Sequence, residues 1–160
     1  MKKTPPLGGG RLVIYPLKGA EIMKRIAFIG DIHGALNELN ILHRMLQNYS
    51  LDAIEHCGDL IDRGPDPAGV LRFCRERKIH GVMGNHESVI LDYPRKKTIP
   101  RNPDKARSLE AIYSHPENLP YIESLPFYKL HGERLIQTHA GMNPFQPMHD
   151  QRMNNREHIM

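Results

Sequence analysis

The chain of 160 residues contains no tryptophan and only two cysteines, Cys57 and Cys74. Two cysteines so far apart cannot build the disulfide framework of a small secreted domain or a paired-cysteine zinc site. We therefore expect two free, buried thiols. The chain also lacks any apolar run near the ~18 residues that a membrane span needs, and its N-terminus lacks the apolar core of a signal peptide. These absences predict a cytoplasmic protein with no membrane partner.

Composition narrows the class of protein further. Hydrophobic residues make up 39% and charged residues 25%, which excludes a disordered polyampholyte, and 13 glycines with 13 prolines predict many loops. A chain of this length has room for one domain. The net charge of +4 favours anionic partners only weakly, whereas ten histidines raise the expectation of a metal site or acid–base chemistry.

The first 22 residues differ from the rest of the chain. They contain Pro5, Pro6 and a run of three glycines, whereas Met23 precedes an apolar run as an ordinary protein start would. We therefore predict a flexible N-terminal extension over residues 1–22 and a folded domain over residues 23–160. The alternative for the extension is an edge strand formed by Arg11 to Tyr15.

From Arg25 onward, short apolar runs alternate with amphipathic stretches. Three runs end in glycine, at Arg25–Gly30, Ala53–Gly58 and Ile79–Gly84. Each is followed by apolar residues at helical spacing, such as Leu36, Leu39 and Leu42 after the first run. This rhythm predicts an α/β fold with a parallel sheet.

The second half of the chain is less regular. Between Pro94 and Arg107 the apolar period is lost and six basic residues stand against one acid. We expect a solvated loop, with the rim of an anionic-substrate site as the alternative. No aromatic residue interleaves with these charges, so a nucleic-acid partner is not expected. A short helix at Leu109–Tyr113, a segment at Tyr121–Leu130 and a last apolar run at Leu135–Thr138 follow.

Residues with metal-ligating or proton-transfer chemistry follow the apolar runs. In open α/β sheets, ligands bind beyond the carboxyl ends of the strands. There the sequence places Asp31, His33, Asp59, Asp62, Arg63, Asn85, His86 and His139. Each alone is a weak signal, because an aspartate after a strand is commonly a helix cap. Their occurrence after four successive runs is a strong one.

These residue types suit a two-metal site. Asp31 and His33 can hold one cation with mixed oxygen and nitrogen donors, and Asp59 can bridge to a second cation served by Asn85 and His139. Two metals ~3.5 to 4 Å apart can clamp a phosphate and generate hydroxide at neutral pH. Mixed carboxylate, imidazole and amide donors suit Mn, Fe or Zn.

The motifs resemble those of a known family. GDIHG at 30–34, GDLIDRGPD at 58–66, GNHE at 84–87 and HAG at 139–141 are similar to the ordered set of the phosphoprotein phosphatase family of calcineurin-like metallophosphoesterases. The similarity is greatest to the bacterial and phage members and covers Met23 to Gly141. The resemblance implies an αββα sandwich with the active site at the C-terminal ends of the strands.

The resemblance also implies two divalent metal ions, Mn with Fe or Zn as alternatives. It places Asp31, His33 and Asp59 at the first metal, and Asp59, Asn85 and His139 at the second. The nucleophile would be a hydroxide that bridges the metals.

The remaining motif residues match the machinery that handles the substrate. His86 matches the general acid for the leaving oxygen, and Asp62 matches the carboxylate that orients it. Arg63 matches a phosphate-binding arginine, whose planar guanidinium offers a fork to phosphate oxygens.

Members of the resembled family continue past the HAG motif and supply a further histidine and arginine. Neither His149 nor His158 has the sequence context of that histidine, so neither is assigned as a ligand. The sequence therefore predicts missing C-terminal strands, an incomplete second metal site and weak or absent activity. A shortened sequence, a degenerate gene and a short variant completed by another subunit all stay open as explanations.

The function that follows is hydrolysis of phosphomonoesters, with phosphoserine or phosphothreonine in proteins as the leading substrate because of the DRGPD form around Asp62. One alternative is a hydrolase of dinucleoside tetraphosphates or other phosphodiesters. Another is an inactive metal-binding or interaction fragment. The expected partner is a phosphorylated protein or a small phosphoester, and the oligomeric state stays open.

Overall fold

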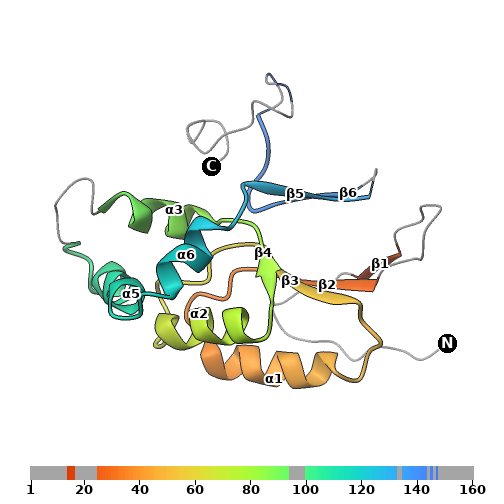
Figure 1. Ribbon diagram of the computed structural model, residues 1–160, viewed down its shortest axis with the longest axis horizontal. Coiled ribbons are helices and arrows are strands. Elements are labelled where there is room, and N and C mark those ends of the chain that lie inside the picture. The colour runs from red at the N-terminus through yellow and green to blue at the C-terminus, as the bar shows by residue number, and fades with distance from the viewer. Residues whose placement is uncertain are drawn as a thin grey trace.

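A four-stranded sheet forms the centre of the structure (Figure 1). The computed structural model describes residues 14–16, 25–93, 100–132, 135–143, 145 and 147. The strand order is β1-β2-β3-β4, with β2 (Arg25–Ile29), β3 (Ala53–His56) and β4 (His80–Gly81) parallel to one another. The predicted α/β fold with a parallel sheet is confirmed.

The first strand falls inside the predicted N-terminal extension. β1 (Ile14–Pro16) pairs antiparallel with β2, with Ile14 opposite Ala27 and Pro16 opposite Arg25. This pairing matches the edge-strand alternative at Ile14 and Tyr15. The other residues of the extension lie outside the described part of the chain.

Two helices cover one side of the sheet (Figure 1). α1 (Leu36–Leu46) buries Leu39 and Leu46, as the helical spacing of its apolar residues predicts. α2 (Pro67–Glu76) begins at Asp66, whose side chain accepts a hydrogen bond from the Gly69 N–H at 2.7 Å. Proline at the first helical position lacks the N–H that would otherwise need a partner.

Three further helices lie beside α2 or after β4. α3 (Asn85–Leu91) follows β4 directly, and α5 (Pro103–Tyr113) and α6 (Asn118–Glu123) pack against α2. Residues 94–99 of the predicted loop lie outside the described residues, but residues 103–107 are helical, so the loop prediction is wrong there. The reason is the cap, because the Asn102 side chain accepts hydrogen bonds from the N–H groups of Asp104 and Lys105.

A separate hairpin lies on the other side of the sheet from α1 and α2 (Figure 1). β5 (Tyr128–His131) and β6 (Leu135–Thr138) pair antiparallel and form their own two-stranded sheet. The predicted last strand therefore exists, but it does not extend the parallel sheet. The Gln137 side chain donates to the His56 carbonyl at 2.8 Å, and Lys129 pairs with Glu55 at 2.7 Å, which ties the hairpin to β3.

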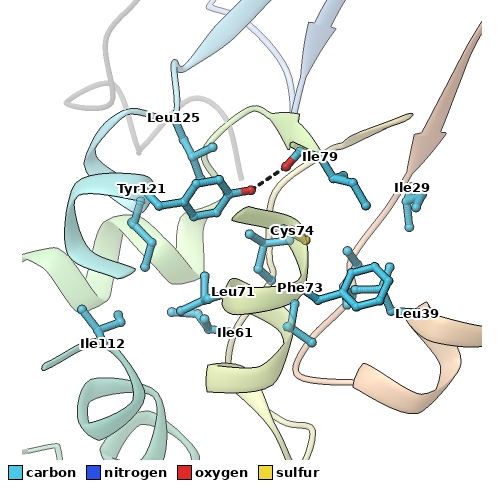
Figure 2. Close-up of a cluster of buried hydrophobic side chains, with 14 of the residues drawn as sticks. Ile29, Leu39, Ile61, Leu71, Phe73, Cys74, Ile79, Ile112, Tyr121 and Leu125 are labelled. Carbon is cyan, nitrogen blue, oxygen red and sulfur yellow. Dashed lines mark hydrogen bonds between the residues drawn. The ribbon is translucent and has the colours of Figure 1, made fainter. Parts of the chain in front are cut away.

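A series of buried hydrogen bonds runs between the aliphatic side chains of the core. The Tyr121 hydroxyl donates to the Ile79 carbonyl at 2.7 Å (Figure 2). The same hydroxyl accepts a hydrogen bond from His56 Nε2 at 3.1 Å. Burial raises the pKa of Tyr121 and lowers the pKa of His56 to about 3. Both cysteines are free, as expected, but only Cys74 is buried, whereas Cys57 is partly exposed. No helix within the described ranges has the length and apolar character needed to cross a bilayer.

Candidate active site

The loops after β2 and β3 adopt unusual backbone conformations. Six described non-glycine residues have positive φ, and five of them are residues that the sequence predicts for the site. They are Asp31, His33, Asp59, Asp62 and Arg63. Such conformations cost ~1 to 3 kcal/mol each and persist where the surrounding structure enforces them, commonly at functional sites.

His33 presents an unused nitrogen to the site. Its Nδ1 donates to the Ile61 carbonyl at 2.9 Å, which leaves a lone pair on Nε2. Nε2 is buried, has no hydrogen-bond partner among the described residues and lies 3.6 Å from Asp59 Oδ2. A backbone carbonyl on one ring nitrogen and a free lone pair on the other are typical of a metal-ligating histidine.

His139 shows the same arrangement from the opposite side. Its Nδ1 donates to the Cys57 carbonyl at 2.8 Å. In the neutral ring Nε2 then carries a lone pair, although it faces Asn85 Oδ1 at 3.0 Å and Asp59 Oδ2 at 3.5 Å. A divalent cation among these three atoms would satisfy all of them.

Asp59 lies at the centre of the site. Its Oδ1 accepts the backbone N–H of His86 at 3.1 Å, and its Oδ2 lies 3.5 to 3.7 Å from Nε2 of three histidines. Those histidines are His33, His86 and His139. Three imidazoles directed at one carboxylate oxygen make Asp59 the natural ligand to be shared by two metals.

Among the described residues, two groups of side chains could each hold a cation. One comprises His33, Asp59 and His86, and the other comprises Asp31, Asp59 and His139, with ligand atoms within 4.8 Å of one another. The structure therefore brings all the predicted ligands together around Asp59, with Asn85 against His139. The grouping differs from the predicted one, because Asp31 lies with His139 and His86 lies with His33.

His86 and Asp62 form a close pair. Asp62 Oδ2 accepts the Nδ1 proton of His86 at 2.6 Å, and the Asp62 side chain is buried. This contact fixes the ring so that Nε2 turns to the site, 3.7 Å from Asp59 Oδ2. The pair thus has the geometry of a proton-transfer group with its orienting carboxylate.

Arg63 lies next to this pair and is exposed. Among the described residues its guanidinium, which carries five N–H donors, has no hydrogen-bond partner or ion pair. Arg63 follows Asp62 directly in the sequence, so its backbone adjoins the His86–Asp62 pair.

Sequence reasoning missed the role of Glu87, the last residue of GNHE. It is fully buried, and its carboxylate accepts backbone N–H bonds at 2.8 to 3.3 Å from four residues. These are Asp59, Leu60, Ile61 and Gly84. Burial, and then the Asp59 charge, raise the pKa of Glu87, and the backbone hydrogen bonds act against this shift. Glu87 therefore holds the Asp59 loop against the start of α3.

Two glycines allow this close approach. A Cβ on Gly84 would lie 2.2 Å from Asp59 Oδ1, and a Cβ on Gly58 would lie 2.6 Å from the Gly84 nitrogen. Both distances are shorter than real contacts. The glycines of GD and GN thus bring the two strand ends together so that their side chains can share one site.

Sequence reasoning also missed two residues of α5. Ser108 Oγ accepts the backbone N–H of Asp62 at 2.9 Å, and Arg107 donates to the Gly64 carbonyl at 3.0 Å. No motif marks either residue, since both lie outside the strand-end segments.

Histidines and carboxylates thus gather at one edge of the sheet, in an arrangement that suits a site for metal ions. Residues 24–158 match the family model of calcineurin-like phosphoesterases, and the chain belongs to this family. The family resemblance of the motifs is thereby confirmed.

Individual relatives differ in their substrates. The chain is 31% identical over 128 residues to a symmetrical bis(5'-nucleosyl)-tetraphosphatase of Buchnera aphidicola, which covers 74% of this chain and 44% of that protein. It is 39% identical over 80 residues to serine/threonine-protein phosphatase 1 of Salmonella typhimurium, which covers 49% of this chain and 37% of that protein. The chain thus spans less than half the length of these curated relatives.

A solved structure also resembles this chain. A crystal structure of a candidate diadenosine tetraphosphatase superposes with a TM-score of 0.69 at 27% identity. The match covers 82% of this chain and 56% of that one. The shared region therefore includes most of the fold described above.

Proposed function

We propose that the chain carries the active site of a metal-dependent hydrolase of dinucleoside tetraphosphates. The observation that carries the chemistry is the convergence of three imidazoles on Asp59 beside the His86–Asp62 pair. Support for the substrate comes from the relatives, because the tetraphosphatase match extends over 128 residues and the protein phosphatase match over 80. This substrate replaces phosphoprotein as the leading candidate.

The site suits two divalent cations by its unused lone pairs and mixed donors. The residues that would hold them are Asp31, His33, Asp59, Asn85 and His139. When bound, the cations neutralise phosphate charge and lower the pKa of water at the site. Manganese fits this donor set, and iron and zinc are alternatives.

His86 would supply the proton for the leaving oxygen. Asp62 holds Nδ1–H, so the proton to be delivered sits on Nε2, which faces the metal ligands. The buried Asp62 carboxylate stabilises the charged imidazole before the proton leaves. For a symmetrically cleaved tetraphosphate the leaving group is a nucleoside diphosphate.

Arg63 would bind the phosphate chain. Arg63 is exposed and follows Asp62 directly in the sequence, and a planar guanidinium matches two oxygens of one phosphate. A tetraphosphate bridge carries several negative charges, so an uncommitted arginine directly after Asp62 favours it over a neutral substrate.

A phosphoserine or phosphothreonine protein is the second candidate substrate. It is supported by the 39% identity to a serine/threonine-protein phosphatase over 80 residues. The sequence form DRGPD around Asp62 adds to this support. The demand on His86 as a general acid would be greater for this substrate, because a serine or threonine alkoxide is a poorer leaving group than a nucleoside diphosphate.

The test compares both substrates on the purified chain with added Mn²⁺. Release of nucleoside diphosphate from diadenosine tetraphosphate and of phosphate from a phosphoserine peptide is measured beside a His86→Asn variant. Faster, His86-dependent cleavage of the tetraphosphate supports the proposal, whereas preference for the peptide supports the second candidate. Manganese binding without turnover of either substrate would support an inactive metal-binding form.

A further inference from the structure

The turn at Asp62–Gly64 is held from outside the motifs by α5. We propose that Ser108 is a positioning residue that orients the His86–Asp62 pair through the backbone of Asp62, with Arg107 bracing the same turn. The proposal rests on the proposed function, because the pair has a task only in a phosphoesterase.

The contact between Ser108 and Asp62 is buried on both sides. Ser108 is 0% exposed and Asp62 is 3% exposed. The hydroxyl accepts the Asp62 N–H at 2.9 Å across 46 residues of sequence. Without that oxygen the N–H would be left unsatisfied in a buried position, which is unfavourable.

The turn needs such a brace because of its backbone. Asp62 and Arg63 are consecutive non-glycine residues with φ of 65° and 62°. Side chains disfavour this left-handed region, so the turn would relax if its external contacts were removed. Arg107 holds its far end through the Gly64 carbonyl at 3.0 Å.

The Asp62 carboxylate itself cannot supply this restraint. Its Oδ2 is engaged with His86 at 2.6 Å, and its buried Oδ1 has no hydrogen-bond partner among the described residues. The direction of the carboxylate is therefore set by its backbone. That backbone is anchored by Ser108, so the position of His86 Nε2 depends on α5.

The test uses two substrates with different leaving groups to distinguish a positioning role of Ser108 from a role in packing alone. Ser108→Ala removes the acceptor, Ser108→Thr keeps a hydroxyl, and Ser114→Ala on the exposed end of α5 is the matched control. Rates are measured for an alkyl phosphate, whose leaving oxygen needs a proton, and for p-nitrophenyl phosphate, whose leaving group needs little help. Thermal unfolding of each variant reports whether the fold is kept.

We expect Ser108→Ala to lower kcat for the alkyl phosphate about tenfold or more and to change the aryl phosphate much less, at unchanged KM. Ser108→Thr should restore the alkyl rate. Equal losses on both substrates, or no loss on either, would overturn the proposal.

A second measurement does not depend on turnover. Amide hydrogen exchange in the metal-free chain should show faster exchange at Asp62 in Ser108→Ala than in the wild type, with exchange in α1 unchanged. An unchanged exchange rate at the Asp62 amide would show that Ser108 does not anchor the turn. If the wild type cleaves neither these phosphomonoesters nor diadenosine tetraphosphate, the proposed function fails, and the exchange result alone decides whether α5 holds the turn.

Discussion

Asp62 Oδ2 and His86 Nδ1 lie 2.6 Å apart, joining the loop after β3 to the first turn of α3. The pair is the shortest link between the two strand-end motifs and sets which imidazole nitrogen faces the site. Proton delivery by His86 should therefore depend on this hydrogen bond.

Replacing the carboxylate tests this link. In Asp62→Asn the amide can no longer stabilise a charged His86, so kcat for an alkyl phosphate should fall about 100-fold with little change in KM. Steady-state kinetics beside Glu76→Gln, an exposed change at the end of α2, measures the effect. A kcat within twofold of the wild type would contradict the assigned role.

Metal binding should stabilise the fold. The predicted ligands come from loops after three strands and from the hairpin, so a bound cation links elements that are separate in the unfolded chain. At a concentration ~100 times Kd, Mn²⁺ should add about 2.7 kcal/mol to the free energy of unfolding.

Thermal melts with Mn²⁺ and with a chelator measure this shift. Asp59→Asn should abolish it, because Asp59 belongs to both ligand groups. His43→Gln on α1 is the control and should keep it. A full shift in Asp59→Asn would argue that the metal binds elsewhere.

Glu87 should matter for both stability and metal affinity. In Glu87→Gln the side-chain amide keeps one acceptor oxygen where the carboxylate has two, and four backbone N–H groups depend on them. We expect a loss of about 2 kcal/mol in the free energy of unfolding, because buried donors lose their partners. Urea unfolding of the metal-free chain checks this loss.

Titration calorimetry with Mn²⁺ then compares Glu87→Gln with Glu38→Gln, an exposed change in the first turn of α1. Affinity should fall only in the first variant, since only Glu87 fixes the Asp59 loop. Equal affinities would show that the loop keeps its geometry without Glu87.

Acid should destabilise the fold through His56. Burial holds its folded pKa at about 3, against 6.5 when unfolded, so the unfolded state takes up a proton first as pH falls. The contribution of His56 to stability is complete above pH ~6.5 and is lost at up to about 1.4 kcal/mol per unit below it.

Urea unfolding at pH 7 and pH 4.5 tests this dependence. The wild type should lose roughly 2 to 3 kcal/mol more than His56→Gln over this interval, because glutamine does not titrate. The variant will be less stable at pH 7, since it loses the hydrogen bond to Tyr121. Parallel pH slopes in the two proteins would contradict the assignment.

The sequence predicted the ligand residues because their signals are local. Asp31, Asp59 and Asn85 each follow an apolar run, and parallel strands bring their ends to one edge. The boundary of α5 was missed because its signal is a cap at Asn102 rather than an apolar period. The sequence analysis favoured a phosphoprotein substrate because of one short motif around Asp62. The longer of the two sequence matches, to a tetraphosphatase, instead supports the tetraphosphate proposal.

The sequence by itself therefore determined the family, the parallel sheet and the set of candidate ligands, since strand periodicity and strand-end motifs depend on neighbouring residues. Only the tertiary structure decided that His139 arrives on a separate hairpin, that Glu87 clamps the Asp59 loop and that Ser108 reaches Asp62. These contacts join residues far apart in the chain. They are set by how helices and hairpin pack around the sheet, which no local pattern records.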